Sequence, residues 1–180
     1  MAADLVVVNH HLFFADMALR DTGVAELLPS VDVAVFDEAH QLAEAGVQFL
    51  GTTLGTGQVL DFARDMLGMG LSQARGLVPW QDLAAACDRA ARELRLAAAG
   101  PTRDLRGTLK LRWDERAAGS AFGQALHGVG SACEDALAGL EQVSELSPDF
   151  TKLAERATQL AVLATRFSEG AATGNVRWIE

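Results

Sequence analysis

The chain has 180 residues, 49% of them hydrophobic, and a formal net charge of −9 at pH 7. This acidity argues against a general affinity for nucleic acids, and no apolar run approaches the length of a membrane span. No secretion signal opens the sequence, and its cysteines, Cys87 and Cys133, lack Cys-x-x-Cys spacing. We therefore expect a cytoplasmic protein in which both thiols are reduced and buried.

Residues 1–50 combine short apolar runs with a helical pattern. The run at residues 5–8 predicts a strand covered on both faces, residues 10–19 predict a helix, and residues 33–36 predict a second strand. Two parallel strands connected through a helix form one right-handed crossover. Since two strands alone cannot bury both faces of a sheet, this segment is expected to be part of a larger α/β sheet.

Two adjacent carboxylates, Asp37 and Glu38, follow the second predicted strand, and His40 follows them. Ligands of a parallel sheet bind outside the carboxyl ends of its strands. An acidic pair at that position suits Mg²⁺, because this hard cation prefers oxygen ligands. An acidic pair that opens a helix can also be no more than favourable charge at the helix N-terminus, and these residues alone leave that alternative open.

The box Asp37-Glu38-Ala39-His40 and the upstream segment Asn9-His10-His11 resemble the iron–sulfur superfamily 2 helicases of the XPD/DinG family, in its bacterial DinG/YoaA-like branch. The resemblance is specific for residues 3–46. It implies ATP hydrolysis coupled to 5′-to-3′ movement on single-stranded or forked DNA in DNA repair, with repair or replication proteins as possible partners. By this resemblance, Asp37 holds the Mg²⁺ of ATP, Glu38 orients or deprotonates the attacking water, and His40 couples nucleotide state to the motor.

The sequence lacks the Gly-x-x-x-x-Gly-Lys-[Ser/Thr] loop that cradles phosphates and the four cysteines that hold the family's 4Fe–4S cluster. We therefore interpret the chain as a fragment and assign ATP, Mg²⁺ and the cluster to a longer parent helicase. The chain alone is expected to be inactive as an ATPase. A zinc site built from His10, His11, Asp37 and His40 is not expected, because adjacent histidines diverge and no His-x-x-x-His spacing occurs.

Residues 58–170 are rich in alanine, leucine and arginine, which favours helices. Helices are predicted at residues 58–67, 79–99 and 117–146 and from Pro148 to Gly170, and a strand is predicted at residues 176–179. Apolar stripes at helical spacing predict buried positions. These positions are Leu83, Cys87, Ala90 and Leu94 on one helix and Phe150, Leu153, Ala157, Leu160, Ala164 and Phe167 on the last.

The predicted fold is mostly α overall: an α/β remnant of a P-loop helicase motor domain, with about two to three strands, plus a mainly α-helical inserted domain. The insertion is expected from the resemblance, because the family carries a helical Arch domain after the acidic box. The predicted domains are residues 1–50 as part of motor domain 1 with the DEAH box, 51–174 as an Arch-like insert, and 175–180 as a strand that returns to the motor domain.

Residues 89–112 contain seven basic and two acidic side chains, which makes them the best candidate for contact with single-stranded DNA. The alternation of Leu109, Leu111 and Trp113 with Lys110 and Arg112 predicts an extended segment. A solvated helix face with a buried tryptophan is the alternative. The candidate nucleic-acid contacts are Arg92, Arg95, Arg106, Lys110, Arg112 and Trp113.

A non-catalytic protein-interaction module with a vestigial DEAH box is the alternative function. It predicts an exposed apolar patch and protein binding that is insensitive to salt. The unpaired edges of the two predicted strands also make a non-native dimer of the fragment possible.

Overall fold

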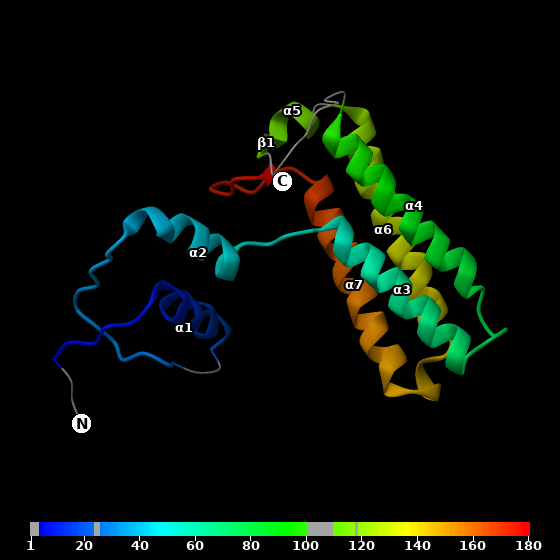
Figure 1. The fold of residues 1–180 in the computed structure, drawn as a ribbon, viewed down its shortest axis with the longest axis horizontal. Coiled ribbons are helices and arrows are strands. Elements are labelled where there is room, and N and C mark those ends of the chain that lie inside the picture. The colour runs from blue at the N-terminus through cyan, green and yellow to red at the C-terminus, as the bar shows by residue number, and fades with distance from the viewer. Residues whose placement is uncertain (1–3, 24–25, 101–109, 118) are drawn as a thin grey trace. The chain divides into compact units, whose positions relative to one another are not determined.

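The structure is a computed structural model that describes residues 4–23, 26–100, 110–117 and 119–180. The chain divides into two compact units, residues 1–53 (unit 1) and 54–180 (unit 2), and each is described by itself (Figure 1). The described residues are mostly helical, which confirms that part of the fold prediction. None of the described helices is long and apolar enough to cross a membrane.

Unit 1 consists of helix α1 (His10–Thr22), a short 3-10 turn η1 (Ala39–Gln41) and helix α2 (Leu42–Leu50), and α1 packs against α2. Helix α1 begins at Asn9, whose side-chain oxygen accepts a hydrogen bond from the Leu12 amide (2.8 Å). It ends at Gly23 in the left-handed conformation (φ 69°), which glycine adopts without steric cost.

The strands predicted at residues 5–8 and 33–36 are not formed, since no described residue of unit 1 belongs to a strand. Val7 is 88% exposed and Val35 is 89% exposed. A strand needs neighbours for its N–H and C=O groups, and two short runs do not make a stable sheet alone. The strands predicted for the α/β part of the fold are therefore absent from the described residues of unit 1, and the assignment of this unit to a helicase motor domain stays a prediction.

Unit 2 is built on four long helices that run alternately in opposite directions (Figure 1). These are α3 (Thr56–Gln73), α4 (Trp80–Ala99), α6 (Ser120–Glu141) and α7 (Pro148–Ser168). Contacts of α3 with α4, of α4 with α6, of α6 with α7 and of α7 with α3 close the ring. The arrangement is an up-and-down four-helix bundle.

The bundle buries the stripes that helical spacing predicts. Cys87, Ala90 and Leu94 are buried on α4, whereas Leu83 is partly buried. Every stripe residue of α7 is buried except Phe167, which is partly buried and packs against the core. Both cysteines are free and buried, as expected. The indole ring of Trp80 stacks on Phe150 with ring centroids 5.9 Å apart, which joins the start of α4 to the start of α7.

Two predicted boundaries were wrong. Helix α3 continues through Gly68 and Gly70 to Gln73, beyond the predicted end at residue 67. At Gly70 an added Cβ would lie 2.2 Å from the Trp80 ring, so this glycine serves close packing. The predicted helix 117–146 is interrupted: α6 ends at Glu141 and a 3-10 turn η2 (Ser144–Leu146) follows.

A two-residue ribbon and a short helix lie at one end of unit 2. Strand β1 (Leu111–Arg112) pairs antiparallel with β2 (Trp178–Ile179), and helix α5 (Trp113–Ala117) begins directly after β1. The predicted C-terminal strand therefore exists, and its described partner is β1. Its assignment as a return to the motor domain stays a prediction.

Candidate functional site

The acidic box forms a tight turn at the start of η1. Glu38 has a left-handed backbone (φ 49°, ψ 45°), which costs a residue with a side chain about 1–2 kcal/mol. Among the described residues other than glycine, Glu38 alone has a positive φ. Such a backbone commonly marks a functional position, and here it belongs to the second carboxylate of the acidic box.

One hydrogen bond and one close side-chain contact connect the residues of the box. The Asp37 carboxylate accepts a hydrogen bond from the Glu38 amide (2.9 Å). The Glu38 carboxylate lies 3.2 Å from Nδ1 of His40, and both side chains are more than half exposed. The three residues to which the sequence assigns nucleotide chemistry are therefore within one another's reach and open to solvent.

A cleft of about 470 Å³ brings the box together with the Asn9 segment. Its lining contains Val8, Asn9, His10 and His11 from the start of α1, Asp37 and Glu38 from the box, and Gln41, Glu44, Ala45 and Gln48 from η1 and α2. The two sequence segments that carry the helicase resemblance thus face one space, although 25 or more residues separate them in the chain.

The cleft suits a divalent cation that also binds phosphate oxygens. Mg²⁺ is usually held by one or two carboxylates together with substrate phosphates, and Asp37 and Glu38 offer such oxygens. Across the described part of the chain, no group of three or more His, Cys, Asp or Glu side chains is placed to hold a metal ion. Asp37 and Glu38 are the carboxylates of this cleft's acidic box that could hold Mg²⁺ together with a nucleotide.

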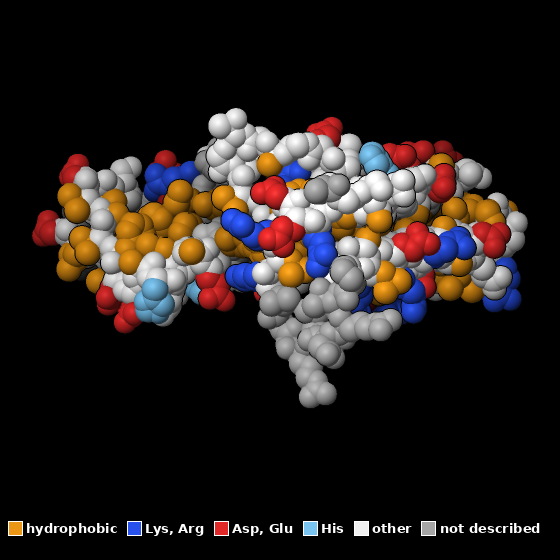
Figure 2. Space-filling model, turned by 90° about the horizontal axis from the view of Figure 1, so that it is seen from above, with side chains coloured by type: hydrophobic (Ala, Val, Ile, Leu, Met, Phe, Trp, Pro, Cys, Tyr) orange, Lys and Arg blue, Asp and Glu red, His pale blue; other side chains and the backbone are white. Residues whose placement is uncertain are grey.

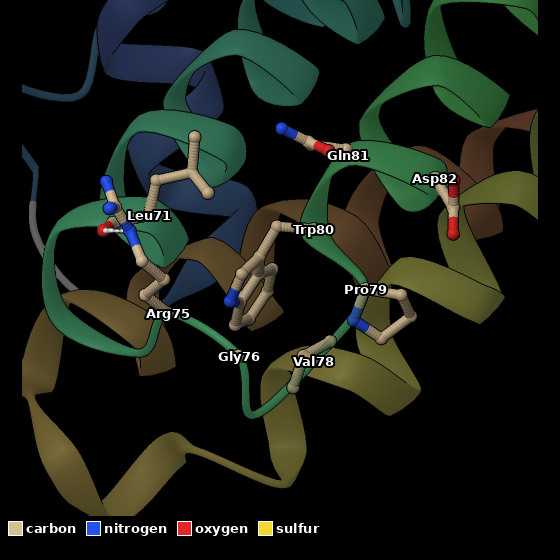
Figure 3. A pocket seen from close by; sticks show the side chains of 8 residues that line it. All are labelled: Leu71, Arg75, Gly76, Val78, Pro79, Trp80, Gln81 and Asp82. Carbon is tan, nitrogen blue, oxygen red and sulfur yellow. Dashed lines mark hydrogen bonds between the residues drawn. The ribbon is translucent and has the colours of Figure 1, made fainter.

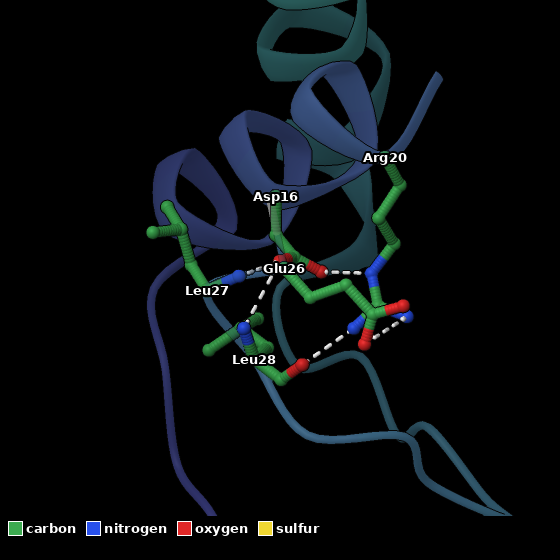
Figure 4. A network of polar contacts seen from close by, with 5 residues as sticks. All are labelled: Asp16, Arg20, Glu26, Leu27 and Leu28. Atoms are coloured by element: carbon green, nitrogen blue, oxygen red, sulfur yellow. Dashed lines mark hydrogen bonds and ion pairs between the residues drawn. The ribbon is translucent and has the colours of Figure 1, made fainter. Parts of the chain in front are cut away.

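A buried carboxylate on α1 was not predicted from the sequence. Asp16 is 4% exposed and binds the connection after α1 (Figure 4). Its carboxylate accepts hydrogen bonds from the amides of Leu27 (2.6 Å) and Leu28 (2.9 Å) and from Nε of Arg20 (2.6 Å). The signal that could have found it is the Asp–Arg pair at four-residue spacing on one helix face.

Desolvation by burial raises the pKa of Asp16, but the hydrogen bonds from the Leu28 amide, Arg20 and the Leu27 amide together outweigh it. The net pKa therefore lies below the usual range, and the carboxylate stays charged at neutral pH. The pKa of Arg20 is raised, first by its hydrogen bond to Asp16. The cluster holds residues 26–28 against α1, and these residues precede the acidic box in the chain.

The predicted nucleic-acid contacts fall into separate groups. Arg92 and Arg95 are exposed on α4, where Arg92 binds Asp88 through two hydrogen bonds (2.7 and 3.1 Å). This hydrogen bonding lowers the pKa of Asp88 and raises that of Arg92. Lys110 and Arg112 are exposed on and beside β1. Arg106 lies outside the described residues.

Trp113 packs inward from the start of α5. Its ring centroid lies 5.2 Å from that of Phe122 and 5.6 Å from that of Phe167, and the guanidinium carbon of Arg177 lies 5.5 Å from it. The geometry favours the alternative that the sequence left open, because this tryptophan is partly buried and packs against the core. On the face drawn in Figure 2, basic side chains lie among acidic ones.

A second cleft, of about 490 Å³, lies at the turn between α3 and α4 (Figure 3). Arg75 and Asp82 line it together with Trp80. The indole Nε1 of Trp80 donates a hydrogen bond to the Ala74 carbonyl (2.9 Å), and Nε of Arg75 donates to the Leu71 carbonyl (3.3 Å). Two polar side chains of this cleft, those of Trp80 and Arg75, are thus engaged in hydrogen bonds within the turn, which favours a structural role for them.

The first cleft thus brings together the Asp-Glu-Ala-His box and the Asn9 segment, the two segments by which the sequence resembles helicases. Over 66 residues, the chain is 53% identical to the ATP-dependent DNA helicase YoaA of Escherichia coli (strain K12); these residues are 37% of this chain and 10% of that protein. Over 64 residues it is 53% identical to the protein of the same name from Haemophilus influenzae, with 36% of this chain and 10% of that protein covered. These matches confirm the resemblance to DinG/YoaA-like helicases for a segment of the chain.

The chain spans about a tenth of the length of these curated relatives. No family model matches it, and no solved structure matches it significantly.

Proposed function

We propose that this chain is a segment of a DinG/YoaA-like, ATP-dependent DNA helicase. It contributes the acidic box of the motor in unit 1 and an Arch-type helical unit, unit 2, that contacts single-stranded DNA. The observation that carries the proposal is the 53% identity to two helicases. The cleft that joins the acidic box to the Asn9 segment supports it.

In the parent protein, Asp37 would hold Mg²⁺ together with the phosphates of ATP, and this ion would neutralise charge on the transferred phosphoryl group. Glu38 would orient or deprotonate the attacking water. His40, whose Nδ1 lies 3.2 Å from the Glu38 carboxylate, would keep that carboxylate in position. The 4Fe–4S cluster belongs to the parent alone, because this chain has two cysteines and both are buried in the helical bundle.

Catalysis is the first property to test. Since the sequence has no phosphate-cradling loop with its lysine, we expect no phosphate release from ATP above a buffer blank. The matched variant Glu38→Gln should give the same blank value. Phosphate release by the unchanged chain that Glu38→Gln abolishes would refute the proposed inactivity of the isolated chain.

DNA binding is the positive test. We expect weak binding of a labelled oligothymidylate in fluorescence anisotropy, with a logarithmic affinity that falls linearly with the logarithm of salt concentration. Each neutralised phosphate contributes a slope of about −0.7 for a single strand. The double variant Arg95→Gln, Arg112→Gln should weaken binding and flatten the slope.

The control is the double variant Arg64→Gln, Lys152→Gln, which removes the same number of exposed positive charges from α3 and α7. It should leave the affinity and the salt slope unchanged. If both double variants weaken binding equally, the contact is unspecific and the proposed role of unit 2 is refuted.

A protein-interaction module is the second candidate function, and one observation favours it. Unit 1 exposes several large apolar side chains, including Leu5 (82%), Val7 (88%), Val33 (76%) and Val35 (89%). Such surface commonly marks an interface. If this surface pairs with a second copy of the chain, light scattering will show a dimer that high salt does not dissociate, and Val35→Lys will make it monomeric.

A further inference from the structure

The β1–β2 ribbon has an inward and an outward face. Leu111 pairs with Ile179, and Arg112 pairs with Trp178. Directly opposed residues of an antiparallel pair point to the same face. Ile179 packs against the hydrophobic core and Leu111 is half-buried, whereas Arg112 and Trp178 are exposed. The outward face therefore presents an indole ring beside a guanidinium group.

Lys110 adds a second cation to this face. Its ammonium nitrogen lies 5.7 Å from the centroid of the Trp178 ring, within the range of a cation–π contact. Among the described residues, neither Lys110 nor Arg112 forms an ion pair with a carboxylate, unlike Arg92 on α4. Both cations are therefore available to phosphate oxygens.

Trp178 is also the tryptophan with an accessible ring. Its residue is 36% exposed, whereas Trp80 is 2% exposed and donates a hydrogen bond within the core. Trp113 is packed between Phe122 and Phe167. A base needs a free aromatic face to stack on, and Trp178 is the most exposed of the three tryptophans. Because Lys110 lies over one face of its ring, a base would stack on the opposite face.

Arg177 fixes the ribbon to the end of α7. Its guanidinium group donates hydrogen bonds to the carbonyl oxygens of Glu169 (2.6 Å) and Arg166 (2.9 Å), and it lies 5.4 Å from the Phe167 ring centroid. These hydrogen bonds cap the C-terminus of α7, and they engage the Arg177 guanidinium group with backbone carbonyls. The backbone at Trp178 therefore follows a residue that is bound to α7, and this attachment reduces the entropy lost when a ligand binds.

We propose that the outward face of the β1–β2 ribbon is a binding site for single-stranded DNA, in which one base stacks on Trp178 while Lys110 and Arg112 contact the flanking phosphates. This inference rests on the proposed contact of unit 2 with single-stranded DNA. It moves the stacking role from Trp113, which the sequence suggested, to Trp178. The base is recognised by its flat face, so the site does not distinguish sequences.

The test compares a twelve-nucleotide oligothymidylate with an abasic strand that has the same number of phosphates. The unchanged chain should bind the thymidine strand about five- to tenfold more tightly, the lower part of the range for one base on an aromatic side chain. Trp178→Ala should abolish this preference while keeping the affinity for the abasic strand and the salt slope. Lys110→Ala should weaken binding of both strands equally.

Intrinsic fluorescence gives an independent readout. Thymidine binding should quench tryptophan emission of the unchanged chain, because a stacked base quenches an indole. Trp178→Phe keeps a ring for stacking, so it should retain the affinity within about twofold and lose the quenching. Leu77→Ala, which truncates a side chain that is 62% exposed at the α3–α4 turn, is the matched surface control and should change neither quantity.

The outcomes separate the two proposals. If the unchanged chain binds neither strand, the proposed DNA contact of unit 2 fails. If it binds both strands and Trp178→Ala retains the preference for bases, or Trp178→Phe retains the quenching, the site on the ribbon is refuted while the DNA contact stands. Binding of a protein partner that Trp178→Ala abolishes, without any preference for bases, also overturns it.

Discussion

Gly70→Ala should destabilise unit 2 although alanine is the better helix former. The added Cβ would lie 2.2 Å from Cδ2 and 2.5 Å from Cγ of Trp80, a ring that is 2% exposed and stacked on Phe150. Overpacking of this kind costs about 1–3 kcal/mol, and loss of the hydrogen bond from the indole to Ala74 adds about 1 kcal/mol. Helix propensity returns about 1 kcal/mol, so the expected net loss is about 1–3 kcal/mol.

Gly68→Ala is the matched control, two residues earlier in the same helix. Its Cβ would meet nothing within 4 Å, so it should stabilise α3 by up to about 1 kcal/mol. Urea unfolding followed by tryptophan emission reports on unit 2 alone, because all three tryptophans lie there. If Gly70→Ala is as stable as Gly68→Ala, the glycine is not required by the Trp80 ring and the packing argument is wrong.

Three further predictions concern single side chains. The pKa of Asp16 is lower in the folded state than in the unfolded state. Its carboxylate therefore stabilises unit 1 fully above the unfolded pKa near 3.8, and this stabilisation is lost as pH falls through the folded pKa. Asp16→Asn should remove the pH dependence and speed hydrogen exchange at the Leu27 and Leu28 amides. Glu38→Gly should stabilise unit 1 by about 1 kcal/mol by relieving the left-handed backbone, whereas Glu44→Gly in α2 should destabilise it by about as much in thermal unfolding. Arg177→Lys should loosen the end of α7 and red-shift the emission of Trp113, because a lysine cannot donate to the several carbonyls that the guanidinium reaches; unchanged emission would contradict this role.

The helical bundle could be predicted because its signals are local. The stripe on α7 from Phe150 to Ala164 follows the helical period, and Ser147 and Pro148 mark the helix start. The end of α3 could not be predicted, since Gly70 is required by a ring from α4. Glycine occurs both where a helix ends and where two elements pack closely, and only the contact in the folded structure tells which of the two applies.

The acidic box could be predicted as a motif, but not its geometry. Asp37, Glu38 and His40 lie together as their spacing implies, while the strand expected before them is absent from the described residues. An apolar run such as residues 33–36 forms a strand only when neighbours pair with it, and this requirement is not local. For the same reason, the pairing of Trp178 with Arg112 could not be predicted from the sequence.

The first and last helices of unit 2 lie side by side. Arg156 of α7 binds Asp65 of α3 (2.6 Å), and the two helices run in opposite directions, so that α3 begins where α7 ends (Figure 1). The helices could therefore follow one another in a different order along the chain and still pack in the same way. A circular permutant that joins residue 180 to residue 54 by a flexible linker and opens new termini near Glu145 should keep all four helix–helix contacts.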